Sequence, residues 1–234
     1  MLRALAFLIA IAASPALALD CHTALVLALD ASNSIDSDEH RLQRKGLADA
    51  LRSPDIQSAI IPYPGDGIVV MAFEWSSPND QTEVAPWTIL SNRQQITAFA
   101  KAIEEGPAIF PRRKTAIGSA IAYASKALGK APIRCRRKVI DISGDGPGNA
   151  GPNPKAIEVE GATVINALVI RNPTLDSAQP PDTDPLVYYQ KRVIRGPGAF
   201  VIVANSYRDY PAAIRRKLLR ELTPMVAQAD GALE

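Results

Sequence analysis

Short apolar runs alternate along this chain with segments whose apolar residues recur at helical spacing. The first run, residues 23–29, is apolar after Thr23 and ends at Asp30. A strand with no polar face is buried on both sides, as in the middle of a parallel sheet. The alternation therefore predicts an α/β fold: a doubly wound, mostly parallel six-stranded sheet with helices on both faces.

The remaining strands are predicted from five further runs, at residues 68–73, 83–90, 139–143, 164–170 and 199–204. Pro86 places the third strand at an edge of the sheet, because proline has no N–H group to donate to a ladder. A stretch near 171–187 is rich in Pro, Asp and Thr and is predicted to be a surface insertion. The basic residues of the last helix are expected on its solvent-exposed face: Arg215, Arg216, Lys217 and Arg220.

Residues 1–18 have the pattern of a secretory signal peptide. Arg3 supplies the positive start, residues 4–13 form an apolar run too short to span a bilayer, and a small-x-small cleavage site follows at 16–18. Asp20 stands where a lipoprotein signal would need a small residue before Cys21. We therefore expect a single domain over 19–234 that is exported to a periplasmic or secreted location, with no membrane span.

The charge balance bears on the kind of partner. The 234 residues carry 26 Lys and Arg against 24 Asp and Glu, a net charge of +2. A nucleic-acid binder that neutralises phosphates needs a larger positive field. Nucleic acid is therefore not expected as a partner.

Cys21 and Cys135 each come immediately before a predicted strand, the first and the fourth. In a sheet of order 3-2-1-4-5-6 these strands are neighbours, so both cysteines lie at the same amino end. Neighbouring strands are roughly 4.8 Å apart, which a disulfide can bridge. In an exported protein we expect the two to pair, the alternative being two buried free thiols.

Polar side chains gather where the first and fourth strands end, at the point where the strand order reverses and ligands usually bind. They supply only oxygen: two carboxylates and three hydroxyls, from Asp30, Ser32, Ser34, Thr115 and Asp145. Hard cations prefer oxygen ligands, whereas zinc prefers nitrogen and sulfur. The sequence therefore predicts a site for Mg²⁺, or for Mn²⁺ or Ca²⁺. Asp141 competes with Asp145 but lies inside the strand, below its carboxyl end.

The set Asp30-x-Ser32-x-Ser34, with Thr115 and the pair Asp145-Gly146, resembles the metal-ion-dependent adhesion site (MIDAS) of von Willebrand factor A domains. The resemblance extends from about residue 23 to residue 222. It implies that the hydroxyls ligate the metal directly or through water, and that a carboxylate of a partner, usually a protein, completes the coordination. The segments near Tyr188-Tyr189 and residues 196–200 are similar to a bacterial family of exported A-like proteins of unestablished function.

Enzymatic alternatives use the same residues. A dehalogenase-like phosphatase would need a second Asp where this chain has Ser32, and a serine hydrolase would need a base. The sequence has two histidines: His22 is at the opposite pole from the site, and His40 is expected to be solvated in the first turn of a helix. We expect a binding protein and no enzyme. A metal-dependent hydrolase and a structural accessory subunit stay open.

Overall fold

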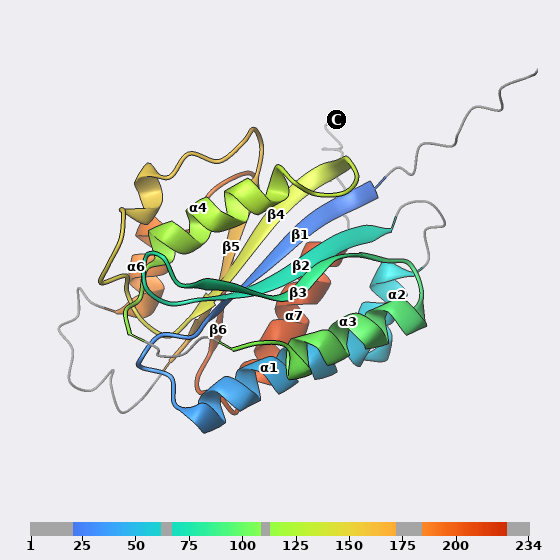
Figure 1. The fold of residues 1–234 in the computed structure, drawn as a ribbon, viewed down its shortest axis with the longest axis horizontal. Helices are drawn as coiled ribbons and strands as arrows, with labels where there is room; N and C mark the ends of the chain where they lie inside the picture. The colour runs from blue at the N-terminus through green and yellow to red at the C-terminus, as the bar shows by residue number, and fades with distance from the viewer. Residues whose placement is uncertain (1–20, 62–66, 109–112, 172–183, 224–234) are drawn as a thin grey trace, which may run out of the picture.

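The computed structural model describes residues 21–61, 67–108, 113–171 and 184–223. The predicted signal peptide lies outside these residues, as does most of the predicted insertion. One sheet crosses the molecule between two layers of helices (Figure 1).

The sheet has six strands in the order β3-β2-β1-β4-β5-β6, which confirms the predicted arrangement. All neighbouring strands are parallel except β2 and β3. The strands are β1 (Cys21–Asp30), β2 (Ile68–Trp75), β3 (Gln81–Leu90), β4 (Cys135–Gly144), β5 (Val164–Ile170) and β6 (Val201–Ala204). The order reverses between β1 and β4, so the space beyond their carboxyl ends is the expected ligand position.

Alternate residues of β1 enter two different cores, which is why the strand has no polar face. Leu25, Leu27 and Leu29 pack against one helical layer, and the small residues Ala24 and Ala28 face the other. The first layer contains α1 (Ser37–Arg52), α2 (Pro54–Ile60), α3 (Arg93–Glu105) and α7 (Tyr210–Leu222). The second contains α4 (Ile117–Leu128), η1 (Pro154–Ala156) and α6 (Pro185–Arg192).

The first helix begins with a capping box formed by Asp36 and Glu39. The Asp36 carboxylate accepts from the backbone N–H groups of Asp38 and Glu39, and the Glu39 carboxylate accepts from the Asp36 N–H. These bonds satisfy N–H groups that the first turn leaves without helical partners. They fix where α1 starts, and with it the length of the loop that leaves β1.

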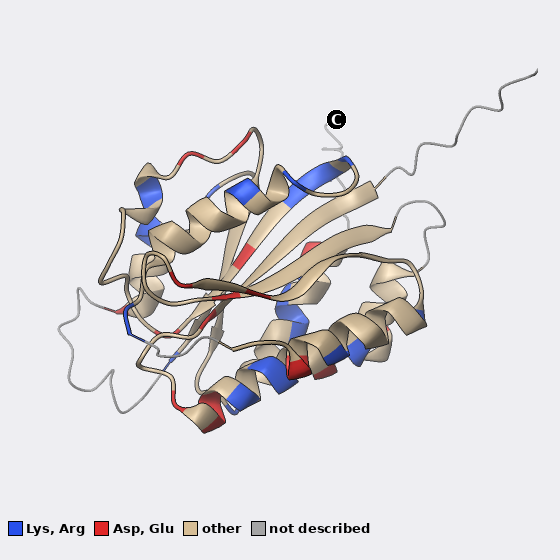
Figure 2. Ribbon diagram, viewed as in Figure 1, with Lys and Arg blue, Asp and Glu red and all other residues tan. Residues whose placement is uncertain are grey.

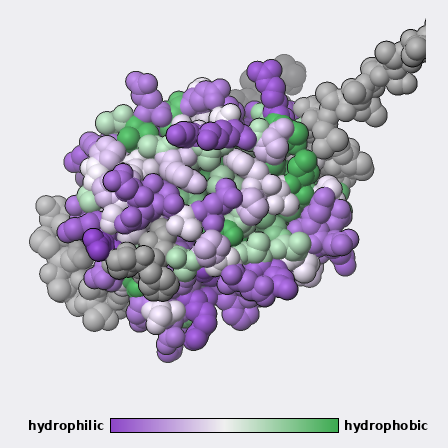
Figure 3. All heavy atoms as spheres, viewed as in Figure 1, coloured by the Kyte–Doolittle hydropathy of each residue, from purple (hydrophilic) through white to green (hydrophobic). Residues whose placement is uncertain are grey.

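Charged residues lie mainly on the outer helices and turns, but β4 begins with a basic stretch and carries Asp141, whereas β5 and β6 have no charged residue (Figure 2). The face that carries α4 is largely hydrophilic, with hydrophobic residues at the surface between α4 and α3 (Figure 3). On this face the β2–β3 side of the sheet is only partly covered, and Trp87 and Ile89 are half-buried. Among the described residues, no helix combines the length and the apolar character that crossing a membrane requires.

Helix α6 was not expected. It begins at Pro185, inside the stretch near 171–187 that its composition marks as a surface insertion. Asp184 caps it by accepting from the N–H groups of Leu186 and Val187. The helix carries Tyr189, fully buried against the sheet, so this segment contributes to the core next to β5.

The expected exposure of Lys217 is wrong. Arg215, Arg216 and Arg220 are exposed as predicted, but the Lys217 side chain is completely buried. Its Nζ lies 2.5 Å from Oδ1 of Asp141 and 2.7 Å from Oε1 of Glu221. Burial raises the pKa of Asp141 to about 7, although the positive charge of Lys217 opposes this shift. A buried charged cluster therefore joins α7 to the middle of β4.

We expect Lys217→Met to lower the free energy of unfolding by about 3 to 5 kcal/mol at pH 7.5. The substitution keeps the volume but leaves the carboxylates of Asp141 and Glu221 buried without their cation. Urea unfolding of Arg216→Met, which removes an exposed charge from the same helix, provides the control and should give a change below about 0.5 kcal/mol. Equal effects in the two variants would contradict a stabilising role for the buried cluster.

The predicted disulfide between Cys21 and Cys135 is confirmed. These are the first residues of β1 and β4, they face each other in the ladder, and their Cα atoms are 4.3 Å apart. The bond closes a loop with a sequence separation of 114. It joins the two central strands at the end of the sheet opposite the polar cluster.

We expect the double variant Cys21→Ala/Cys135→Ala to lose up to about 4 to 5 kcal/mol of stability, the chain-entropy value for a loop of this length. The measurement is urea unfolding with and without a phosphine reductant. Reductant should bring the natural protein to the level of the variant and leave the variant unchanged. Thiol titration of the denatured, unreduced protein should find no free thiol, and two free thiols per chain would refute the bond.

Candidate metal site

The two carboxylates predicted to hold a metal lie side by side at the carboxyl edge of the sheet. Asp30 is the last residue of β1, and Asp145 directly follows the end of β4, its parallel neighbour. Both are almost completely buried, with 0% and 3% of their surface exposed. Parallel pairing of β1 and β4 is thus what brings together two residues 115 positions apart in the sequence.

A continuous series of hydrogen bonds connects four of the five predicted residues. Oδ1 of Asp30 accepts from the Ser32 N–H at 2.7 Å. The hydroxyls of Ser32 and Ser34 are 3.1 Å apart, and the Ser34 hydroxyl donates to Oδ1 of Asp145 at 2.8 Å. The loop after β1 therefore curls back over β4 and places its alternate side chains around one point.

Thr115 is held in place by two residues that the sequence analysis did not single out. Its N–H donates to the side-chain carbonyl of Asn149, whose own N–H donates to the Thr115 carbonyl, both at 2.9 Å. Ser76, the residue after β2, anchors the same loop through the N–H groups of Arg113 and Ala116. In the described part of the chain, the Thr115 hydroxyl forms no hydrogen bond with the other four predicted residues. Ser76 and Asn149 follow the carboxyl ends of β2 and β4, and this position is the sequence signal that could have identified them.

One oxygen of each carboxylate is left without a partner. Oδ2 of Asp30 and Oδ2 of Asp145 are buried and accept no hydrogen bond, and neither side chain has an ion pair within the described residues. Burial raises the pKa of Asp30 well above its ordinary value, and the negative charge of Asp145 raises it further. Burial likewise raises the pKa of Asp145. Unpaired buried carboxylates are costly. A divalent cation would compensate them, so the residues fit the predicted metal.

Buried tyrosines close the site from α6 and from the segment after β6. The Tyr189 hydroxyl lies near Gly144, at which a Cβ would also stand 2.9 Å from Oδ2 of Asp30. Burial raises the pKa of Tyr189 and of Tyr207, and the nearby carboxylates of Asp30 and Asp145 add to this. Within the described chain the Tyr189 hydroxyl has no hydrogen-bond partner, and the Tyr207 hydroxyl lies close to the Asp145 carboxylate. Glycine at position 144 thus lets a carboxylate and a phenol approach the same part of β4.

Three other residues are not available as ligands. Asp141 lies inside β4 and pairs with Lys217, so it is not a competing ligand. His40 is not solvated as expected: it is 8% exposed, and its Nε2 lies 2.5 Å from Oε1 of Glu74. Trp75 is the neighbour of Asp30 in the ladder, but its side chain is completely buried.

A profile of the family described as protein of unknown function (DUF1194) matches residues 20–226. The chain belongs to this family. No curated protein is similar enough in sequence to count as a match. The family description names no activity, so the geometry of the site carries the functional argument.

Several solved structures share the fold. Mussel byssus proximal thread matrix protein 1, in a structure with a zinc-occupied MIDAS motif, is 17% identical with a TM-score of 0.56, covering 88% of this chain and 47% of that chain. The pilus adhesin SpaC of Lactobacillus rhamnosus GG is 15% identical with a TM-score of 0.55, and the match covers 86% of this chain and 30% of that chain. A von Willebrand factor type A protein of Catenulispora acidiphila is 15% identical with a TM-score of 0.51, and the match covers 86% of this chain and 42% of that chain.

This chain spans less than half the length of each of these chains. At such identities the similarity shows the fold alone, which is that of a von Willebrand factor A domain. The predicted resemblance is confirmed at this level.

The three buried aspartates predict an unusual pH dependence for the metal-stripped protein. The pKa values of Asp30, Asp141 and Asp145 are raised on folding, that of Asp141 to about 7, so above about pH 4 the folded state binds more protons than the unfolded state. Their contribution to stability is complete below about pH 4 and is lost as the pH rises through the raised pKa of each group. Asp30→Asn removes one of these groups.

We therefore expect the stability difference between the natural protein and Asp30→Asn to favour the natural protein more at pH 4.5 than at pH 7.5. Urea unfolding of both proteins at several pH values, after metal removal, measures it. Glu105→Gln, an exposed change at the end of α3, is the control and should show no such trend. A difference independent of pH would contradict the raised pKa of Asp30.

Proposed function

We propose that this protein is an exported interaction domain that binds a partner protein through a divalent cation. Asp30, Ser32, Ser34, Thr115 and Asp145 would hold the cation, with Mg²⁺ as the preferred ion because all the ligand atoms are oxygen. The observation that carries the proposal is the pair of buried carboxylate oxygens, Asp30 Oδ2 and Asp145 Oδ2, which have no partner within the described chain.

The balance of charge explains why the partner would bring a carboxylate. Two aspartates neutralise one divalent ion, and hydroxyl ligands add coordination without adding charge. A further anionic ligand is then accepted more readily than at a site that already has three or four carboxylates. Ser34 and its neighbour Asn33 are exposed, so the loop after β1 is accessible from solvent. When bound, the cation supplies the positive charge that such a ligand needs.

This chain's own residues would set the geometry of the site. The Ser32 N–H and the Ser34 hydroxyl each occupy one oxygen of an aspartate and so orient the other oxygen inward. The side-chain carbonyl and the backbone N–H of Asn149 both bond to the backbone of Thr115 and so fix the loop that carries it. A site oriented before the ion arrives loses little conformational entropy on binding.

Three further observations support binding over catalysis and export over retention. His40, the histidine nearest along the sequence to the proposed ligands, is already bound to Glu74 and is not free to act as a base. The similar structures include a mussel byssus matrix protein and a pilus adhesin. The disulfide between Cys21 and Cys135 fits an oxidising compartment, in agreement with the signal peptide predicted at residues 1–18.

The decisive experiment measures metal and partner binding separately. We expect isothermal titration of the natural protein with Mg²⁺ to show one site, and Asp30→Ala or Thr115→Ala to abolish or strongly weaken it, because ligands are lost while the hydrophobic core is untouched. Affinity capture from an export-compartment extract should then retain partners that are released by chelator. Neither variant should retain them.

Asn33→Ala is the matched control, since this exposed residue lies in the same loop between two proposed ligands. It should bind Mg²⁺ and the captured partner as the natural protein does. Unchanged, chelator-sensitive capture by both Asp30→Ala and Thr115→Ala would overturn the site assignment. Metal-dependent turnover of a chromogenic phosphate or ester, lost in the same variants, would support the hydrolase alternative instead.

A further inference from the structure

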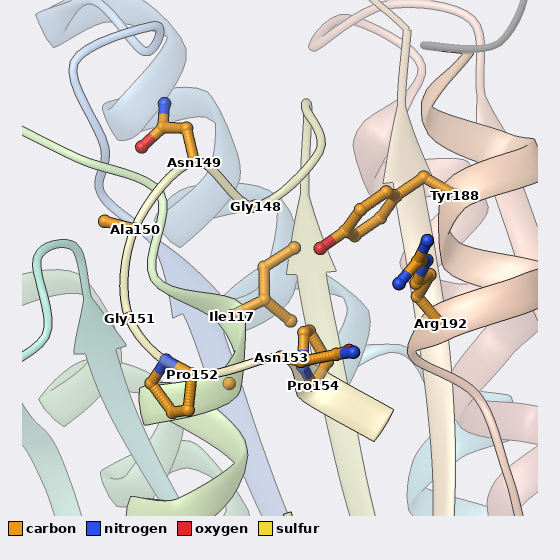
Figure 4. A pocket seen from close by; sticks show the side chains of 11 residues that line it. Ile117, Gly148, Asn149, Ala150, Gly151, Pro152, Asn153, Pro154, Tyr188 and Arg192 are labelled. Atoms are coloured by element: carbon orange, nitrogen blue, oxygen red, sulfur yellow. The ribbon is translucent and has the colours of Figure 1, made fainter. Parts of the chain in front are cut away.

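A cleft of about 410 Å³ lies next to the proposed metal site. Its walls come from the first turn of α4, the loop 148–154 and two residues of α6, Tyr188 and Arg192. Tyr188 and Arg192 project into the cleft from one side, facing Ile117, Pro152 and the residues after it, while Asn149 points away (Figure 4). Its volume is in the range of small-molecule binding sites.

The lining of this cleft has one kind of charge. Among the described residues that line it, Arg192 is the one that carries a charge, and none is acidic. Within the described chain, the guanidinium of Arg192 forms no ion pair and no hydrogen bond with a side chain. An arginine presents several N–H donors in a planar fork that suits a carboxylate. The cleft is therefore complementary to an anionic group.

The rest of the lining is apolar or neutral. Ile117, Pro152 and Pro154 supply aliphatic surface, and the half-buried ring of Tyr188 adds an aromatic one. A free inorganic anion would make no use of these surfaces. A peptide segment would use both, by placing an acidic side chain at Arg192 and a neighbouring apolar side chain against the proline and isoleucine walls.

The wall of the cleft is continuous with the metal site. Asn149, in the loop that forms one wall, makes both backbone-directed bonds to Thr115. On the opposite wall, two consecutive residues of α6 face the metal site and the cleft. The Tyr189 hydroxyl is near Gly144, at the metal site. The Tyr188 hydroxyl is beside Gly148, in the cleft, where a Cβ would stand 2.8 Å from it. A partner that reaches the cation can thus reach the cleft without crossing another element.

We infer that this cleft is a second contact for the partner protein, binding an acidic side chain together with an adjacent apolar residue. The inference rests on the proposed function for the identity of that partner. The cleft itself uses no metal ligand. It therefore binds its segment when the metal site is empty, and it adds to affinity when both contacts are made in one partner.

The test uses the metal-stripped, isotope-labelled full protein and two capped dipeptides, acetyl-Glu-Leu-amide and acetyl-Gln-Leu-amide. Amide chemical shifts locate the binding, and their concentration dependence gives the affinity. We expect the acidic peptide to shift Gly148, Gly151 and Arg192 and to bind at least tenfold more tightly than the neutral one. Arg192→Ala should lose that difference, and Arg192→Lys should keep part of it.

Lys191→Ala is the matched control: it removes the same charge one residue earlier on α6, outside the cleft lining. It should leave the affinity unchanged, as should Asp30→Asn, which disables the metal site alone. Equal binding of the two peptides, shifts outside the cleft, or the same loss in Lys191→Ala would overturn the inference. Inorganic phosphate that competes at equal affinity would also overturn it, in favour of a small-anion site. Because no metal is present, failure here leaves the proposed metal site untouched.

Discussion

The burial of Asp30 beside Asp145 is the constraint on which the polar end of this molecule depends. Two carboxylates in a low-dielectric environment repel each other and lack water. The surrounding structure responds by donating one hydrogen bond to each, from the Ser32 N–H and the Ser34 hydroxyl. Within the described residues it supplies no positively charged side chain, and the second oxygens stay unpartnered. Such an arrangement costs stability unless a cation binds, which supports the proposed metal site.

The fold and most of the proposed ligand set were predictable because both follow from periodicity and strand order. An all-apolar strand ending in Asp30 has to be central, and a doubly wound order puts the fourth strand beside it. That reasoning also paired Cys21 with Cys135, as the structure confirms. The residues that support the site were missed because they come from three separate segments, two loops and helix α6, and form no spaced motif: Ser76, Asn149 and Tyr189.

Lys217 shows how two sequence signals can conflict. Its spacing from Ala213, Ile214 and Leu218 puts it on the buried stripe of α7, whereas its charge favours an exposed side chain. Periodicity was the better guide, because Glu221 four residues later and Asp141 in the middle of an apolar strand provide its partners. His40 follows the same pattern with Glu74. In both cases one partner lies on another element, Asp141 on β4 for Lys217 and Glu74 on β2 for His40, so the position alone cannot reveal the burial.

The disulfide and the polar cluster sit at opposite ends of the same two strands, and strand register connects them. The ladder that pairs Cys21 with Cys135 also pairs Leu29 with Ser143, which sets Asp30 beside the end of β4. A slip of one residue would exchange the faces of Leu29 and Asp30, sending a leucine to the polar side and a carboxylate into the α1–α7 core. The covalent bond at the amino end excludes that slip. It therefore protects the geometry of a site that lies a full strand length away, without contributing any atom to it.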